Sequence, residues 1–292
     1  MTEHKATPLL IALALLSLTL IGGAALGGLR EDTGPTKREE RKITIDPDLL
    51  QARAAILYDP TTREILFDKH AELQLPLASL AKLAAATVAL RRGQGEVVIG
   101  AEDLGTEGDS GLRAGERWNR ATLVAFALRT SSNDATAALA RAGAGSQEGA
   151  TPSLNELAEE LGLLQTYFLN PTGLDFSSST AGAYGSALDV AILLAEVLHR
   201  HPAILASTLA TLESFEDESG KSHAAAPTSL PIGDVPGLIA AKTGFTDLAG
   251  GNLAIIFDRG LGEPLVAVVL HSSLEGRFKD MRLLVEAVRT LK

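Results

Sequence analysis

The chain has 292 residues, of which 46% are hydrophobic and 21% charged, and this composition excludes a wholly disordered protein. The net charge of −10 argues against nucleic acid as a partner, because phosphate binding needs a basic surface. The sequence has no cysteine, which excludes disulfides, zinc–thiolate sites, iron–sulfur clusters and a cysteine nucleophile.

Residues 6–29 form a run of 24 residues without a single charge. As a helix this run would span roughly 36 Å, which is long enough to cross a bilayer with some tilt. The apolar centre of a secretory signal peptide is shorter, about 7–15 residues. We therefore expect a transmembrane helix at 6–29 after a short tail at 1–5. A signal segment cleaved near Ala25-Leu26-Gly27 is the alternative.

Residues 30–45 are rich in charge and are predicted to be a solvated linker in front of a domain at 46–292. Lys and Arg are more frequent after the apolar run than before it. By itself this distribution favours an orientation in which the residues after the run lie in the cytoplasm. The chemistry described below requires the opposite orientation, and we follow the chemistry.

Within the domain, strand-like and helix-like patterns follow one another. A hairpin is expected from strands at 54–58 and 64–67, joined by turn-forming residues. Next come a buried helix that starts just after Ser79, a short strand, two helices that flank residues 130–133, and two helices that begin with capping-box patterns. The acidic residues 213–218 are expected to form a solvated loop. Three strands and an amphipathic helix close the chain. The ranges predicted after the hairpin are 80–91, 96–99, 122–128, 135–141, 153–162, 186–199, 238–243, 252–257, 264–271 and 278–291.

Strands at both ends of the domain, with helices between them, predict a mixed α/β fold. We expect one central antiparallel sheet built from both chain ends, with a helical subdomain on one side. The stretch from residue 46 to residue 292 lies within the size range of a single large domain.

The first motif that carries chemistry is Ser79-Leu80-Ala81-Lys82. Positions i and i+3 share a helix face, so the amine of Lys82 can reach the hydroxyl of Ser79. Serine needs a base to become a nucleophile, and lysine can be that base when burial and a second cation lower its pKa. The motif is short, and a serine that merely caps a helix is the alternative interpretation.

The second motif, Ser131-Ser132-Asn133, lies between two predicted helices, where a hydroxyl and an amide can project into a cleft. The third, Lys242-Thr243-Gly244, ends a predicted strand. There Lys242 can supply the second cation near Lys82, and Gly244 lets a substrate backbone approach closely. Taken singly, these two motifs are also explained by a capped loop and by a turn.

The order Ser-x-x-Lys, Ser-x-Asn, Lys-Thr-Gly is that of the penicillin-recognising serine enzymes. The chain resembles the low-molecular-mass penicillin-binding proteins that are D-alanyl-D-alanine carboxypeptidases, with a β-lactamase/transpeptidase-like fold. The resemblance extends over the domain, and it includes an Asn-Pro-x-Gly-Leu segment. It departs from the family pattern at Ala81, at Ala240-Ala241 and at residues 227–229, where many members have Asn-Thr-Asn. The matching segments are 54–59, 75–83, 131–135, 168–175 and 242–250.

The resemblance implies a serine peptidase mechanism. Ser79 would attack the carbonyl between the two terminal D-alanines of a peptidoglycan stem peptide, and Lys82 would accept its proton. Ser131 would relay a proton to the departing D-alanine. Backbone N–H groups of Ser79 and Phe245 would form the oxyanion hole. No metal or cofactor is implied, and β-lactam antibiotics are expected to inhibit the enzyme by acylating Ser79.

Other positions are implied to bind the substrate. Asn133 and Lys242 would position the stem peptide, and Thr243 would bind its terminal carboxylate. Arg277 occupies the place from which an arginine can hold the same carboxylate in this family. The resemblance further implies a bacterial protein with its catalytic domain on the extracytoplasmic side of the membrane, or secreted if the apolar segment is cleaved.

Three other functions remain open at this point. A serine β-lactamase shares the fold, but the Glu-x-x-Leu-Asn pattern of class A enzymes is missing between Ser131 and Lys242. A D,D-endopeptidase would use the same residues on cross-linked peptides. A catalytically silent envelope-binding protein would have no need to keep nucleophile and base together.

Overall fold

The computed structural model describes residues 43–105, 108, 110–209, 213–260 and 262–288. The expected tail at 1–5, the expected membrane helix at 6–29 and most of the expected linker lie outside these ranges. Among the described residues, no helix combines the length and the hydropathy needed to cross a bilayer. Ile43 is buried and donates its N–H to the carbonyl of Leu66 at 2.8 Å, so the chain packs against the domain before residue 46.

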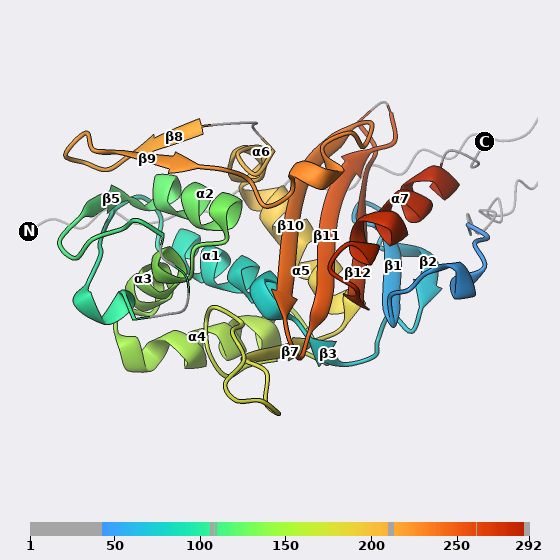
Figure 1. Cartoon of the computed structure of the whole chain (residues 1–292), viewed down its shortest axis with the longest axis horizontal. Coiled ribbons are helices and arrows are strands. Elements are labelled where there is room, and N and C mark those ends of the chain that lie inside the picture. The colour runs from blue at the N-terminus through green and yellow to red at the C-terminus, as the bar shows by residue number, and fades with distance from the viewer. Residues whose placement is uncertain (1–42, 106–107, 109, 210–212, 261, 289–292) are drawn as a thin grey trace, which may run out of the picture. The chain divides into compact units, whose positions relative to one another are not determined.

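The helices in the described part of the chain are α1 (Lys82–Arg91), α2 (Arg120–Thr130), α3 (Asn133–Ala144), α4 (Gln147–Glu160), α5 (Ala187–Arg200), α6 (Pro202–Ala206) and α7 (Gly276–Val288). Helices α1–α4 lie to one side of a large sheet, and α5 and α7 pack against the sheet (Figure 1). The 3-10 turns are η1 (Pro47–Leu49), η2 (Ala78–Ala81), η3 (Ala101–Asp103) and η4 (Leu230–Ile232). The strands are β1 (Ala54–Asp59), β2 (Glu64–Lys69), β3 (Leu75–Pro76), β4 (Glu96–Val98), β5 (Arg117–Asn119), β6 (Tyr167–Phe168), β7 (Ala183–Gly185), β8 (Glu213–Glu216), β9 (Ser222–Ala225), β10 (Leu238–Thr246), β11 (Gly250–Asp258) and β12 (Pro264–Ser272).

The expected sheet from both chain ends is confirmed. Five antiparallel strands follow the order β10-β11-β12-β1-β2, so the first strand of the domain pairs with the last. Successive side chains of a strand point to opposite faces, and the core divides accordingly. Ile56 and Val268 join the apolar cluster of α1–α5, whereas Leu57 and Val269 join the cluster of α7. The sheet is therefore buried on both faces.

Helix α7 is tied to the sheet by a buried carboxylate. Asp280 accepts hydrogen bonds from the N–H groups of Gln51 and Ala52, both at 2.9 Å, and from the hydroxyl of Ser272 at 2.7 Å. These bonds join the start of the domain, the last strand and the closing helix. They also hold α7, whose first turn carries Arg277 beside the third motif.

Some expected elements are corrected by the structure. Ser79 lies inside the 3-10 turn η2, and the α-helix begins only at Lys82. The helix expected at 153–162 begins at Gln147, because Ser146 caps it by accepting the N–H of Gly149, and buried residues such as Ala150 hold the added turns despite Pro152. The acidic stretch expected as a loop contains strand β8, which pairs with β9 and buries Phe215.

Candidate active site

The nucleophile segment is a tight turn that places a serine against a buried lysine. Ala78, just before Ser79, has a φ of 47°, which is uncommon for a residue with a side chain. Such backbone strain clusters at functional sites. Lys82 is 1% exposed, and its Nζ lies 2.7 Å from Ser79 Oγ. The predicted contact between these two residues is therefore present.

A second partner orients Lys82 from a loop that the sequence motifs leave out. The carbonyl oxygen of Thr172 accepts a hydrogen bond from Lys82 Nζ at 2.9 Å. The side chain of Asn170 holds this loop, since its Oδ1 accepts the N–H groups of Thr172 and Gly173, at 3.2 and 2.8 Å, and its Nδ2 donates to the carbonyl of Leu174 at 2.9 Å. The Asn-Pro-Thr-Gly segment thus supplies an acceptor for the lysine.

Gly173 lets this loop touch the nucleophile turn. Its φ is +77°, and a Cβ built on it would lie 1.9 Å from the carbonyl oxygen of Ala78. No side chain fits at that distance. Glycine is therefore required here both by the backbone conformation and by the close approach of two segments.

The second motif forms the junction between α2 and α3. Ser131 takes the left-handed conformation at the end of α2, and Ser132 caps α3 by accepting the N–H of Ala135 at 3.0 Å. Asn133 is the first residue of α3. The hydroxyl of Ser131 accepts a hydrogen bond from Lys242 Nζ at 2.9 Å, which joins the second motif to the third.

The third motif lies on β10, the edge strand of the sheet on the side of α1 and α2 (Figure 1). Lys242 is 2% exposed, and its Nζ also donates to the carbonyl of Thr243 at 2.8 Å. The hydroxyl of Thr243 donates to that of Thr228 at 2.7 Å. A Cβ on Gly244 would lie 3.2 Å from the nitrogen of Ser79, so β10 packs directly against the nucleophile turn. Phe245 follows with its side chain exposed.

Arg277 lies against the third motif but is directed to the backbone. Its Nη1 donates to the carbonyl of Gly244 at 2.7 Å, and the guanidinium packs over the ring of Phe278. Nε is buried and makes no hydrogen bond with the described residues. The structure thus places Arg277 beside the site, and its binding of a substrate carboxylate stays a prediction.

Burial and a neighbouring cation lower the pKa of each of the two lysines in the site. Burial, followed by the charge of Lys242, holds the pKa of Lys82 well below the usual 10.5. Burial, followed by the charge of Arg277, lowers the pKa of Lys242 to about 7. A lysine with a lowered pKa can be neutral near physiological pH, and a neutral amine can accept the proton of an adjacent hydroxyl.

A cavity of about 260 Å³ opens beside the second motif. It is lined by Ser131, Ser132 and Asn133 on one side and by Ala224 and Ala226 of the β8–β9 hairpin on the other. The second motif therefore borders a space that a ligand can enter.

Sequence reasoning missed several residues that build this site. Thr172 supplies the carbonyl that accepts a hydrogen bond from Lys82, and Thr228 accepts one from the hydroxyl of Thr243. Asp175 accepts hydrogen bonds from the hydroxyl of Thr246 at 2.9 Å and from the N–H of Leu248 at 3.2 Å. Both segments stood out in the resemblance, one as a match at 168–175 and the other as a departure at 227–229. Neither pattern indicates which backbone atom reaches the lysine.

The comparisons with known proteins agree with this geometry. Residues 41–273 match the model of the peptidase S11 family, described as D-alanyl-D-alanine carboxypeptidase. The chain belongs to this family. It is 30% identical over 231 residues to the D-alanyl-D-alanine carboxypeptidase DacF of Bacillus subtilis, covering 76% of this chain and 58% of that protein.

Two further relatives extend the comparison. A D-alanyl-D-alanine endopeptidase of Escherichia coli is 28% identical over 211 residues, covering 69% of this chain and 66% of that protein. The chain therefore spans less than two thirds of the length of either curated relative. The structure of penicillin-binding protein D2 from Listeria monocytogenes in the ampicillin-bound form has a TM-score of 0.69 and 27% identity, covering 82% of this chain and 97% of that one.

Removing the charge of Lys242 should raise the pKa of Lys82. In Lys242→Met the burial of Lys82 remains, but the positive charge that disfavours its protonation is gone. The protonated form of Lys82 should then persist to higher pH, as measured from the ¹³C shift of its ε carbon during a titration. Lys279→Met, which removes an exposed cation, serves as the control. A pKa of Lys82 that does not rise in Lys242→Met would contradict the coupling.

Adding one methyl group at Gly173 should destabilise the protein more than the same change at Gly162. Both glycines have positive φ, +77° and +68°, but only Gly173 lacks space for a Cβ. Gly162→Ala should lower the free energy of unfolding by about 1 kcal/mol through backbone strain alone. Gly173→Ala should cost about 1–3 kcal/mol more through the steric conflict with Ala78. Urea denaturation measures both, and equal losses would refute the contact.

Proposed function

We propose that this chain is a serine-type D-alanyl-D-alanine carboxypeptidase that removes the terminal D-alanine from peptidoglycan stem peptides. The hydrogen bond of 2.7 Å between Lys82 Nζ and Ser79 Oγ, inside a buried site that lowers the pKa of the lysine, carries this proposal. Membership of the D-alanyl-D-alanine carboxypeptidase family supports it.

In the proposed acylation step, neutral Lys82 takes the proton of Ser79 as the serine oxygen attacks the peptide carbonyl. The carbonyl of Thr172 accepts one N–H of the amine, which directs the nitrogen lone pair toward Ser79. Negative charge on the tetrahedral oxygen would be stabilised by the backbone N–H groups of Ser79 and Phe245. Gly244 supports this assignment, because its missing side chain brings β10 against the nucleophile turn.

The departing D-alanine needs a proton, and Ser131 is proposed to deliver it. The hydrogen bond from Lys242 to Ser131 links that hydroxyl to a cation, so the proton the serine loses can be replaced. Asn133, at the first turn of α3 beside the cavity, and Thr243 are proposed to hold the substrate, the latter through its terminal carboxylate. Arg277 would add its positive charge to the same end. Water then hydrolyses the acyl-enzyme.

Two alternative activities, those of a D,D-endopeptidase and of a β-lactamase, would use the same residues. The similarity to an endopeptidase of Escherichia coli supports cleavage of D-alanyl bonds in cross-linked peptides as the second candidate. The similarity to a penicillin-binding protein whose structure holds ampicillin supports binding of β-lactams as substrate mimics. A β-lactamase would require fast loss of the acyl group, for which the chain has no Glu-x-x-Leu-Asn pattern between the second and third motifs.

Replacing Ser79 should abolish both D-alanine release and penicillin labelling. The full chain is incubated with benzylpenicillin, and the adduct is followed by intact-mass spectrometry. In separate reactions the chain is incubated with a pentapeptide, to measure D-alanine release, and with cross-linked muropeptides, to measure their cleavage. Ser79→Ala should lose at least about 10³-fold in each reaction. Lys82→Ala should slow acylation by about 10²–10⁴-fold, as expected when a general base is lost. Ser178→Ala, which removes an exposed serine, should be labelled like the unaltered chain.

The outcomes of this experiment separate the candidates. A persistent one-to-one adduct on Ser79 with release of D-alanine from the pentapeptide supports the carboxypeptidase. Cleavage of cross-linked muropeptides alone would favour the endopeptidase, and an adduct that disappears as the drug is consumed would favour a β-lactamase. Labelling that persists in Ser79→Ala would refute the nucleophile, and a folded chain that reacts with none of the probes would be a silent envelope protein.

We also propose that residues 6–29 anchor the protein in the bacterial membrane with the catalytic domain on the extracytoplasmic side. The uncharged length of the segment and the location of peptidoglycan support this orientation. A reporter that is active only outside the cytoplasm, fused after Lys292, should be active, and the protein should sediment with membranes. Activity of a cytoplasm-specific reporter instead would contradict the orientation, and a mature protein that starts after Gly27 would show a cleaved signal.

A further inference from the structure

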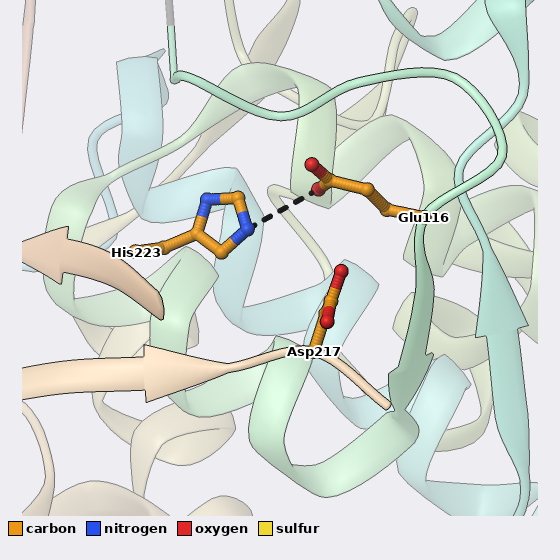
Figure 2. A group of neighbouring side chains, drawn as sticks. All are labelled: Glu116, Asp217 and His223. Atoms are coloured by element: carbon orange, nitrogen blue, oxygen red, sulfur yellow. Dashed lines mark ion pairs between the residues drawn. The ribbon is translucent and has the colours of Figure 1, made fainter. Parts of the chain in front are cut away.

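Three side chains from separate segments meet next to the β8–β9 hairpin. Glu116 lies just before β5, Asp217 just after β8, and His223 within β9. Each offers one ligand atom, and these atoms all lie within 4.8 Å of one another. Figure 2 shows the imidazole and the two carboxylates directed into a common space. None of the three takes part in the site built around Ser79.

His223 lies within ion-pair distance of one carboxylate but makes no hydrogen bond through its Nε2 with the described residues. Its side chain is 5% exposed, and its ring packs against those of Trp118 and Phe126, with centroids 4.9 and 6.2 Å away. The buried Nε2 makes no hydrogen bond with the described residues, although it points at Glu116 and lies 3.4 Å from Oε2. A buried polar atom that makes no hydrogen bond is costly, and a cation placed between the imidazole and the carboxylates would satisfy it.

The distances suit a metal ion. Ligand atoms about 2.1 Å from zinc and arranged tetrahedrally around it lie about 3.4 Å from one another. The separation of 3.4 Å between His223 Nε2 and Glu116 Oε2 equals this edge. The remaining edges to Asp217 are at most 4.8 Å and would have to shorten by up to about 1.4 Å when the ion binds.

The neighbouring groups already hold both carboxylates in place. The ammonium of Lys221 pairs with Oε1 of Glu116, which leaves Oε2 facing the histidine, where the indole N–H of Trp118 makes a long contact of 3.4 Å. Oδ1 of Asp217 accepts from the N–H and the hydroxyl of Ser219, at 2.8 and 2.6 Å, and from the N–H of Lys221 at 3.0 Å. Ligating carboxylates in metal sites are commonly supported by such outer hydrogen bonds.

We propose that Glu116, Asp217 and His223 form a binding site for a divalent transition-metal ion, zinc in the first place, with water completing the coordination. One imidazole with two carboxylates suits zinc, whereas calcium and magnesium prefer oxygen ligands alone. Lys221 offsets part of the negative charge, but its side chain is 39% exposed and can turn toward solvent.

The site would brace one wall of the catalytic cavity. His223 and Ala224 are neighbours in β9 and point to opposite faces of the strand, one to the cluster and the other to the cavity beside Ser131. The carbonyl of Ala225 accepts a hydrogen bond from Arg129 Nε at 2.8 Å, just before the second motif. A metal that joins β5 to the hairpin would therefore hold this wall, without touching the reacting atoms.

Zinc titration of the full chain tests the proposal. The untagged protein is stripped with a chelator, transferred to chelator-free buffer and titrated calorimetrically with ZnCl₂. We expect one zinc per chain, and a melting temperature about 5 °C or more higher at a zinc concentration one hundred times Kd. His223→Gln and Asp217→Asn should each weaken binding by more than about 100-fold, beyond the usual effect of losing an outer partner. His199→Gln, an exposed histidine at the end of α5, should bind like the unaltered chain.

Two further measurements locate the ion and guard against misfolded variants. X-ray absorption should show one imidazole and otherwise oxygen ligands, and zinc should slow amide exchange in residues 213–225. Each variant must still be labelled on Ser79 by benzylpenicillin, or by an active ester if the proposed function fails, which shows that it is folded. Absence of zinc binding, unchanged binding in His223→Gln, or equal binding of magnesium would each overturn the proposal.

Discussion

The burial of two lysines side by side is the constraint on which the rest of this structure depends. Lys82 and Lys242 are almost completely removed from solvent, and water can no longer stabilise their charges. Their pKa values fall, so the amine that contacts Ser79 can be a base rather than an ammonium. Such a pair costs stability, and the surrounding fold has to provide acceptors for its N–H groups. The Thr172 carbonyl, the Thr243 carbonyl and the Ser131 hydroxyl are these acceptors.

Each acceptor comes from a different part of the chain, which explains why the site needs both the sheet and the helical region. The edge strand β10 carries Lys242 and Thr243, the α2–α3 junction carries Ser131, and the loop after β6 carries Thr172. Two glycines allow these parts to meet, because both pack on the nucleophile turn: Gly244 against the nitrogen of Ser79 and Gly173 against the carbonyl of Ala78. The strained φ values of Ala78 and Ser131 lie at the same meeting point. Strain and contact are thus concentrated where the chemistry is proposed.

How far the sequence could predict this site depended on the range of each interaction. The contact between Ser79 and Lys82 follows from a spacing of three residues, and it was predicted correctly, although the turn is 3-10 rather than α-helical. A single antiparallel sheet built from both chain ends was predicted correctly from the order of strands and helices, whereas the pairing of β1 with β12 came from the structure. The start of α4 was wrong, because the capping-box pattern that begins at Ser153 lies inside a helix whose actual N-cap is Ser146. Strand β8 was missed, since an acidic stretch shows no sign of the pairing that buries Phe215.

The sequence by itself determined the residue types that chemistry requires: a serine and a lysine one helical turn apart, a Ser-x-Asn junction and a Lys-Thr-Gly strand end. These features are local, so spacing and periodicity reveal them. Only the tertiary structure decided that the carbonyl of Thr172 directs the lysine, that Arg277 faces the backbone of Gly244, and that His223 meets two carboxylates from other segments. Backbone acceptors and long-range side-chain clusters leave no periodic pattern, because they arise only when distant segments pack together.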